Sequence, residues 1–336
     1  MSDNENVTAR VIELCGEFDR IAVQVYAHLA EVQTIKNINK FWKVMSEEEQ
    51  KHCFFWKKMS ELSKKIELPD LFPNKSIIAD LERDMETVRG LQKNLGSYVS
   101  LEKAFLLAYR MEFYAVHPPF EMLFQYAQIM QPFLGIESPM EGYEKHISLF
   151  IDALRYFSEP QDALAMVGEM LMRTWRDNHA MVRLHYFDQV TGVLNRRGLM
   201  DIGSSLCSLA KKGDLPLSVA LVNIDGFKEV NELVGSDEGD RILRWLADSM
   251  SDSFSEASLI GRPGGDSFLV VEQTDDFERM EQSVEQTRRR MPEPSVPLSF
   301  SHICMVIDKH TCSLGMDSVL PQMELALKEK RLTTLD

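Results

Sequence analysis

The sequence lacks a long apolar run. No stretch of its 336 residues approaches the roughly 20 consecutive apolar residues with which a helix crosses a bilayer, and the opening Met-Ser-Asp-Asn-Glu-Asn is not a signal peptide. Basic residues are also scarce, because 37 Lys and Arg stand against 52 Asp and Glu and leave a net charge of −15. This charge argues against a nucleic acid or an anionic membrane as a partner. We therefore expect a cytoplasmic protein.

Paired cysteines are missing too. The five cysteines are scattered, odd in number and without the spacing of a metal-binding pair: Cys15, Cys53, Cys207, Cys304 and Cys312. We expect reduced thiols that mostly belong to the core. Internal repeats and low-complexity tracts are absent as well, and a chain of this length is typical of two domains.

The most informative segment is Arg262-Pro-Gly-Gly-Asp-Ser-Phe268. Two adjacent glycines allow a tight turn and expose backbone N–H groups at close range, as a phosphate ligand requires. Apolar, strand-forming runs flank it at 258–260 and 268–271, which predicts a hairpin. Alone, such a Gly-Gly-Asp is more often a plain turn.

The residues before the hairpin change that interpretation. The near-continuous apolar run from Leu217 predicts a buried central strand that ends in polar residues. Alternation places Asn223 and Asp225, at its end, on one face of the sheet. The motif-like segments around it are Asp188-Gln-Val-Thr-Gly192, Asn195-Arg-Arg197, Phe227-Lys228, Asn231-Glu232 and Gly239-Asp240.

In this order and spacing these residues resemble the GGDEF family of diguanylate cyclases, over roughly residues 186–331. The resemblance implies Mg²⁺ and GTP as ligands: acids at the strand end and in the hairpin hold the metal on the triphosphate, while one GTP's 3′-hydroxyl attacks the other's α-phosphate. It assigns catalytic positions to Asn223, Asp225 and Asp266. It assigns guanine nucleotide binding to Asn231, Asp240, Lys228, Gly264 and Gly265.

The sequence departs from the family pattern at the metal site. The first strand-end acid is Asn223 and the second hairpin acid is Ser267; an amide offers Mg²⁺ an oxygen without charge, although Asp225 partly compensates. Other positions also depart from the family. The phosphate clamp is altered at 323–331, and the following arginine position is Leu335. Ser301-His302-Ile303 replaces the usual Ser-Ile-Gly, Ser236 replaces a histidine, and Ser255 with Ser258 stand where the product-inhibition site would be. We therefore expect a weak or inactive cyclase. Instead of contacting a nucleotide, Asn231 and Asp240 could be a helix cap and a turn residue. Lys228 could likewise be a solvated surface lysine.

The first half is predicted to be entirely helical. Apolar residues recur at helical spacing over Val11–Val32, Phe41–Leu62, Ile77–Leu95, Leu101–Met130 and His146–Phe157. The pair Pro118-Pro119 either interrupts or kinks the fourth of these segments. The pattern is that of a helical bundle.

Several bundle residues form a possible metal site. Glu49 and His52 share a helical face in a Glu-x-x-His pair, which di-iron carboxylate bundles use together with single carboxylates from other helices. Asp19, seven residues before Tyr26, resembles the first helix of rubrerythrins with Asp in place of Glu. The remaining candidates are Glu112 and His146, with Tyr143 or Glu144 standing in for a missing Glu. A solvated helix face is the simpler alternative for a lone Glu-x-x-His pair.

We thus expect an α plus α/β two-domain fold: a ferritin-like four-helix bundle in residues 1–158, a linker helix in 159–186, and a GGDEF-type domain of ferredoxin-like, cyclase-palm character in 187–336. The last should contain β-α-α-β-β-α-β in a mainly antiparallel sheet. Its helices are expected near Asn195–Lys212, Asp237–Ser251, Asp275–Met291 and Met316–Lys330, and its strands near Ser218–Asp225, Ser258–Gly261, Phe268–Glu272 and Leu298–Ile307.

The predicted function is a homodimeric cyclic-di-GMP-type signalling protein. A di-iron or manganese sensor bundle would control a degenerate GGDEF domain that binds guanine nucleotide or a protein partner. Two alternatives stay open. One is an active diguanylate cyclase regulated by the bundle, and the other is a di-iron oxidase or peroxidase bundle with a regulatory C-terminal domain.

Overall fold

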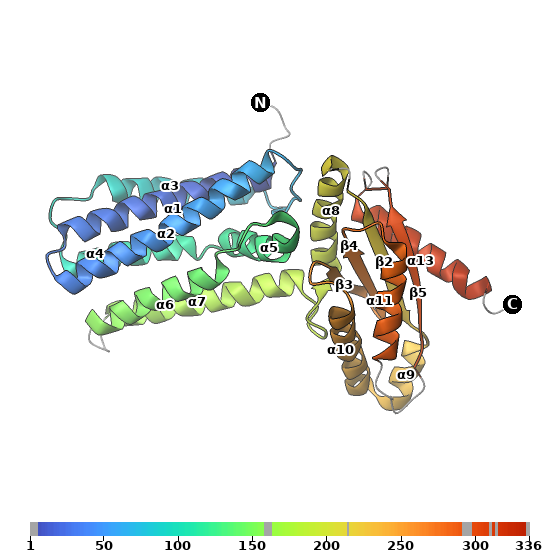
Figure 1. Ribbon diagram of the computed structural model, residues 1–336. Helices are drawn as coiled ribbons and strands as arrows, with labels where there is room; N and C mark the ends of the chain where they lie inside the picture. Colours follow the sequence, from blue (N-terminus) through green and yellow to red (C-terminus); the bar gives the residue numbers. More distant parts are fainter. Residues whose placement is uncertain are drawn as a thin grey trace. The chain divides into compact units, whose positions relative to one another are not determined.

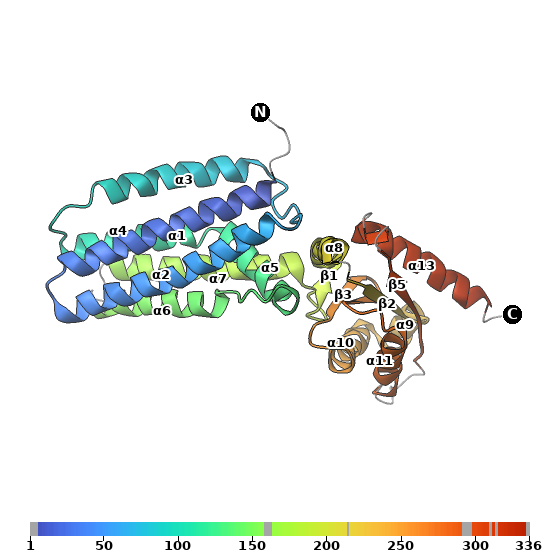
Figure 2. The same ribbon diagram turned by 45° about the horizontal axis from the view of Figure 1, so that its top comes forward.

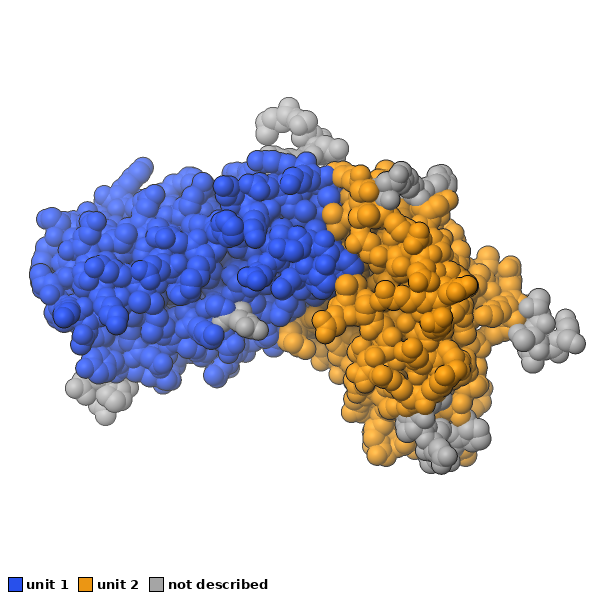
Figure 3. Space-filling model, viewed as in Figure 1, with its two compact units in different colours: residues 1–182 blue, residues 183–336 orange. Residues whose placement is uncertain are grey.

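The structure is a computed structural model that describes residues 6–157, 163–213, 215–290, 298–308, 311–312 and 315–333. The chain forms two compact units, residues 1–182 and 183–336, coloured separately in Figure 3. The first unit holds the region expected as a bundle and most of the helix expected as a linker. Among the described residues, no helix combines the length and the apolarity needed to cross a membrane.

The described part of the first unit contains helices and no strand. Figures 1 and 2 show them running side by side. Their bounds are α1 Val7–Val32, α2 Lys36–Ser63, α3 Ser76–Lys93, α4 Leu101–Ala115, α5 Pro118–Leu134, α6 Met140–Phe157 and α7 Ala163–Tyr186, whose last residues belong to the second unit. The expected helical bundle is confirmed.

One expected helix is two. The segment Leu101–Met130 breaks after Ala115, because the pair Pro118-Pro119 lacks backbone N–H donors and cannot continue α4. Proline suits the first turn of a helix, so α5 begins there, and it ends at Gly135, whose φ of +61° forms a left-handed cap. The expected ligand-bearing helices are therefore α1, α2, α4 and α6.

Helix α7 is fixed at two places along its length. Within the first unit, Asn178 donates to the Val116 carbonyl (2.6 Å), and His179 pairs with Glu121 of α5 (2.5 Å). Within the second unit, the Asn195 side chain donates to the carbonyls of Leu184, His185 and Phe187 at the end of the helix (2.9 to 3.3 Å). These bonds satisfy carbonyls that a helix end otherwise leaves unpaired.

The second unit is built on a five-stranded sheet of order β1-β3-β4-β2-β5. Its elements are β1 Leu194–Asn195, α8 Arg196–Gly213, β2 Leu217–Ile224, α9 Phe227–Val234, α10 Ser236–Ser253, β3 Leu259–Gly264, β4 Ser267–Glu272, α11 Phe277–Arg289, β5 Phe300–Ile307 and α13 Met316–Thr333. The expected β-α-α-β-β-α-β order holds from β2 to β5. Among the strands that the structure describes, only β1 pairs in parallel, with β3. This two-residue strand is too short to leave a pattern in the sequence.

The central strand carries the core of this unit. All eight residues of β2 are buried, as expected for a strand covered on both faces. One face packs against α10 and α11 through residues such as Val222, Leu246 and Met280, while α8 and α13 lie on the other face (Figure 2). The last residues of β2 therefore emerge between two helical layers, beside the β3–β4 hairpin.

Candidate metal centre and candidate nucleotide site

A cluster of ionisable side chains lies in the interior of the bundle. Each member is at most 2% exposed, and α1, α2, α4 and α6 supply them in the expected order: Asp19, Glu49, His52, Glu112 and His146. Their ligand atoms form two groups, each within 4.8 Å, which are Asp19 with Glu49 and His52, and Glu49 with Glu112 and His146. Glu49 belongs to both groups. The structure thus brings all five predicted ligands together.

The two oxygens of Glu49 face different imidazoles. Oε2 lies 2.9 Å from His52 Nδ1, and Oε1 lies 3.3 Å from His146 Nε2. His52 Nδ1 is also 4.0 Å from Asp19 Oδ2, while His146 Nε2 is 2.9 Å from Glu112 Oε1. A carboxylate placed between two such groups has the arrangement of a ligand shared by two metal ions.

Surrounding side chains orient the terminal carboxylates. Trp56 Nε1–H donates to Asp19 Oδ2 (2.6 Å), and the Tyr26 hydroxyl donates to Glu112. Outer partners of this kind fix the geometry of metal ligands. In the described part of the bundle, Glu112 Oε2 and His146 Nδ1 are buried without a hydrogen-bond partner. An unpaired carboxylate oxygen in a core is costly, so the donor set fits a divalent cation that would use it.

Burial shifts the acidity of the cluster. It raises the pKa of Glu49 to about 8, and it raises the pKa of Asp19 well above its usual range. Burial also lowers the pKa of His52 to about 4. For His146 burial lowers the pKa, but Glu112 and Glu49 together outweigh it and raise the pKa to about 9. Buried charges of this number cost several kcal/mol each and are seldom kept for stability.

The sixth expected position differs from the prediction. Glu144 is exposed and is not brought to the cluster, because two residues before His146 on a helix lies on a different face. Tyr143 takes the inward position three residues before His146, where it is 3% exposed and its hydroxyl has no hydrogen-bond partner among the described residues. A metal ion at Glu49, Glu112 and His146 would therefore have one carboxylate fewer than a Glu-x-x-His pair on this helix would provide.

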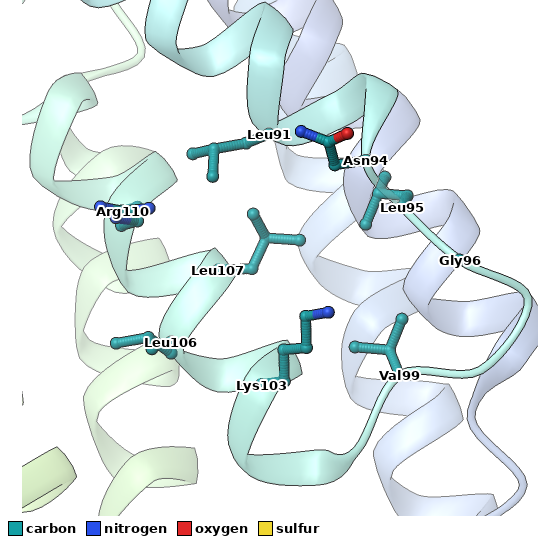
Figure 4. Close-up of a pocket in the computed structure, with 9 residues that line it drawn as sticks. All are labelled: Leu91, Asn94, Leu95, Gly96, Val99, Lys103, Leu106, Leu107 and Arg110. Atoms are coloured by element: carbon teal, nitrogen blue, oxygen red, sulfur yellow. The ribbon is translucent and has the colours of Figure 1, made fainter.

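Two cavities of the bundle differ in their relation to the cluster. A hollow of about 630 Å³ between α2 and the start of α6 includes His52 and Gly142 in its wall and so reaches the edge of the cluster. Figure 4 shows another, of about 170 Å³, formed by the end of α3, the following loop and α4; Leu91 and Leu107 line it, and no cluster residue does.

In the second unit, the polar end of β2 meets a cation from α13. Arg331 donates to the Asn223 side-chain oxygen and to Asp225 Oδ1 (2.5 Å). Asn223 in turn donates to Ser267 Oγ (3.0 Å), its partner across the β2–β4 ladder. Asp225 also accepts from the hydroxyls of Ser299 (2.9 Å) and Ser301 (2.7 Å). The guanidinium thus holds the two side chains that the resemblance assigns to Mg²⁺.

The hairpin tip is fixed beside this strand end. Gly265, with φ of +54°, and Asp266 form a two-residue turn, and the Asp266 carbonyl accepts from the Ile224 N–H (3.1 Å). Arg262 donates to the Gly265 carbonyl (2.6 and 2.8 Å) and to Asp188 Oδ1 (3.0 Å). Gly264 and Gly265 are both exposed, so their backbone is open to a ligand.

The expected base-contacting residues lie where α9 meets α10. Asn231 on α9 faces Gly239 on α10 so closely that a Cβ at Gly239 would lie 1.9 Å from Asn231 Oδ1. Asp240 follows Gly239 directly and is half-buried. Lys228, by contrast, has a side chain 84% exposed and a long ion pair with Glu232 (3.9 Å), so the surface-lysine alternative stays open for it.

Arg331 is the functional residue that the sequence did not reveal as such. In the sequence, the segment 323–331 that contains Arg331 was noted only because it differs from the family's phosphate clamp. A helical pattern in this segment does not show that the side chain of Arg331 reaches the end of β2. Trp56 was not expected to contact the cluster, because it stands within the apolar pattern of its helix, and Tyr26 was noted only for its spacing from Asp19. Leu335, the altered arginine position, lies outside the described residues.

The second unit thus combines a mixed sheet with a glycine hairpin beside the end of its central strand. In a comparison with known families, residues 185–316 match the family described as diguanylate cyclase, GGDEF domain. Residues 185–316 therefore form a GGDEF domain.

Individual relatives agree with this assignment. The chain is 30% identical over 131 residues to diguanylate cyclase DgcP of Escherichia coli K12, which covers 39% of this chain and 36% of DgcP. It is 34% identical over 120 residues to the response regulator PleD of Caulobacter vibrioides, covering 34% of this chain and 26% of PleD. The chain therefore spans about a third or less of the length of these curated relatives.

Solved structures are also similar. The coiled coil and GGDEF domain of DgcB from Caulobacter crescentus, in complex with c-di-GMP, matches 51% of this chain and 93% of that chain, with 19% identity and a TM-score of 0.45. Diguanylate cyclase SiaD from Pseudomonas aeruginosa, in complex with its activator SiaC, matches 78% of this chain and 89% of that chain, with 18% identity and a TM-score of 0.41.

Proposed function

We propose that this chain is a cyclic-di-GMP-type signalling protein in which a ferritin-like, metal-binding bundle controls a GGDEF domain that binds guanine nucleotide and is weak or inactive as a cyclase. The observation that carries the proposal is the pair of bonds from Arg331 to Asn223 and Asp225.

These bonds argue against magnesium at the strand end. GGDEF domains use Mg²⁺ with GTP, and such an ion is held by anionic oxygens. Here Asn223 and Ser267 carry no charge, and the carboxylate of Asp225 already pairs with a guanidinium. The residues present therefore do not fit the ion well.

Nucleotide binding depends on different residues. Asn231 and Asp240 stand at the α9–α10 contact, which Gly239 keeps close, and the exposed backbone of Gly264 and Gly265 suits phosphate oxygens. We propose that these positions retain GTP or a related guanine nucleotide.

The bundle would hold iron or manganese on Asp19, Glu49, His52, Glu112 and His146. Carboxylate and imidazole ligands suit both metals, and a bound iron pair would supply a charge that changes with oxidation state. Trp56 and Tyr26 keep the carboxylates of Asp19 and Glu112 in place, and the hollow lined in part by His52 reaches the edge of the cluster.

The cyclase part is tested with purified full-length protein, GTP, and Mg²⁺ or Mn²⁺. We expect guanine nucleotide binding and no accumulation of c-di-GMP, with Asp240→Asn as the variant that loses binding. Robust turnover would overturn the proposal in favour of an active cyclase.

The metal part is tested by elemental analysis after aerobic purification and after reconstitution with Fe(II) or Mn(II). Glu112→Gln should lose metal, whereas Glu144→Gln, an exposed change on the same helix as His146, should keep it. Protein that contains neither metal and gains none would refute this part. Peroxide-dependent turnover by the loaded bundle would favour an oxidase or peroxidase.

A further inference from the structure

A second group of metal-ligating side chains lies in the GGDEF domain, away from the nucleotide site. It consists of Glu281 on α11 with His302 and Cys304 on β5. His302 pairs with Val222 across the ladder, and Val222 belongs to the core beneath α10 and α11. The group therefore lies on the opposite face of the sheet from Asn223 and Arg331.

The geometry brings three different ligand types to one point. His302 and Cys304 are two residues apart on a strand and so share a face, and Glu281 Oε2 lies 2.8 Å from His302 Nε2. One ligand atom from each residue lies within 4.8 Å of the others. The sequence is unusual here as well, because His302 stands where the family has an apolar Ile.

The group is open to solvent on one side and closed on the other. The side chains of Glu281 and His302 are 35% and 17% exposed, whereas Cys304 is only 7% exposed. Since β5 is an edge strand, an ion can approach from the side of Glu281 without disturbing the core. Lys330 lies nearby, but its ammonium donates to the His302 carbonyl (3.0 Å).

We propose that Glu281, His302 and Cys304 bind a zinc ion, with water as the fourth ligand. Zinc favours this mixture of carboxylate, imidazole and thiolate in a tetrahedral site, at about 2.0 to 2.3 Å from each atom. The ligand atoms need to move only slightly from their present contacts to reach such distances. Binding displaces the Cys304 proton to solvent, as metal coordination by a thiol requires.

The site ties α11 to the edge of the sheet. With zinc bound, three bonds to one ion replace the ion pair between Glu281 and His302, and they add to the bond that Arg288 of α11 donates to the Phe300 carbonyl (2.9 Å). This inference does not depend on metal in the bundle or on cyclase activity.

The test uses Co(II) as a spectroscopic probe on the full-length protein. A Co(II)–thiolate bond gives an intense near-ultraviolet charge-transfer band, and the bundle cluster contains no cysteine that could produce one. We expect the band in the unaltered protein, its loss in Cys304→Ser, and its retention in Cys53→Ser, a cysteine of α2 that lies outside the proposed site.

Zinc competition against a chromophoric chelator gives an independent measurement. His302→Gln and Glu281→Gln should each lower the zinc affinity of this site at least as much as the loss of an outer-shell partner does, which is roughly 10- to 100-fold. These two variants replace Cys304→Ser in the test if that variant does not fold. Absence of the band in the unaltered protein, or its survival in Cys304→Ser, would overturn the proposal and leave the group as an ion pair beside a core cysteine.

Discussion

Placing acids at positions 223 and 267 should create a magnesium dependence that we expect the native protein to lack. In the variant Asn223→Asp with Ser267→Glu, both new carboxylates face the end of β2, where Arg331 now lies. A pair of unit charges about 4 Å apart interacts by roughly 4 kcal/mol at an effective dielectric constant near 20, and desolvation and the guanidinium offset most of that. A remainder of about 1.4 kcal/mol still changes affinity tenfold.

We therefore expect GTP to bind this double variant at least about tenfold more tightly with Mg²⁺ than with EDTA, whereas the native protein shows little difference. Titration with a fluorescent GTP analogue measures this, and chromatography detects any c-di-GMP. Arg331→Gln should act in the same direction, because it frees Asp225 to bind the ion. The matched control places the same charge on exposed positions, as Ser251→Glu with Gln322→Glu. If the native protein depends on Mg²⁺ as steeply as the double variant, a shortage of charge is not the defect.

Three further predictions concern both units. Glu49→Gln should abolish metal at both bundle subsites, because this carboxylate faces both imidazoles, while Glu144→Gln keeps the metal; elemental analysis decides, and loss of only one ion would disprove the shared role. The metal affinity of the bundle should rise between about pH 6 and 9, because Glu49, with a pKa of about 8, and His146, with a pKa of about 9, must lose protons to bind a metal ion. Calorimetry in buffers of different ionisation enthalpy measures the protons released. Metal binding that does not depend on pH would contradict this prediction. Gly239→Ala should weaken GTP binding about tenfold. The added Cβ would displace the side-chain amide of Asn231, which lies at the far end of that side chain, so the melting temperature should change little. Unchanged GTP affinity would exclude a base contact by Asn231.

The sequence predicted the sheet and the membership of the bundle cluster better than it predicted contacts between distant elements. The run from Leu217 and the hairpin glycines are local signals, so β2, β3 and β4 were expected within a few residues. The Glu49-x-x-His52 pair likewise shows its geometry through helical spacing. Arg331 meets Asn223 across 108 residues, and no local pattern records such a meeting. The end of α4 depended on whether a proline pair breaks or bends a helix, which tertiary packing decides.

The anchoring of α7 has a consequence for how a signal would travel. A helix resists stretching, because its hydrogen bonds run along its axis. A small shift of α7 at Asn178 and His179 would therefore also rotate or translate the end of the helix, where Asn195 binds the last carbonyls. Asn195 ends the first β-strand of the GGDEF domain, three residues before Gly198, whose backbone lies close against the Tyr186 carbonyl. A rotation of α7 would therefore first strain the contact between Tyr186 and Gly198, where no space is left for a side chain.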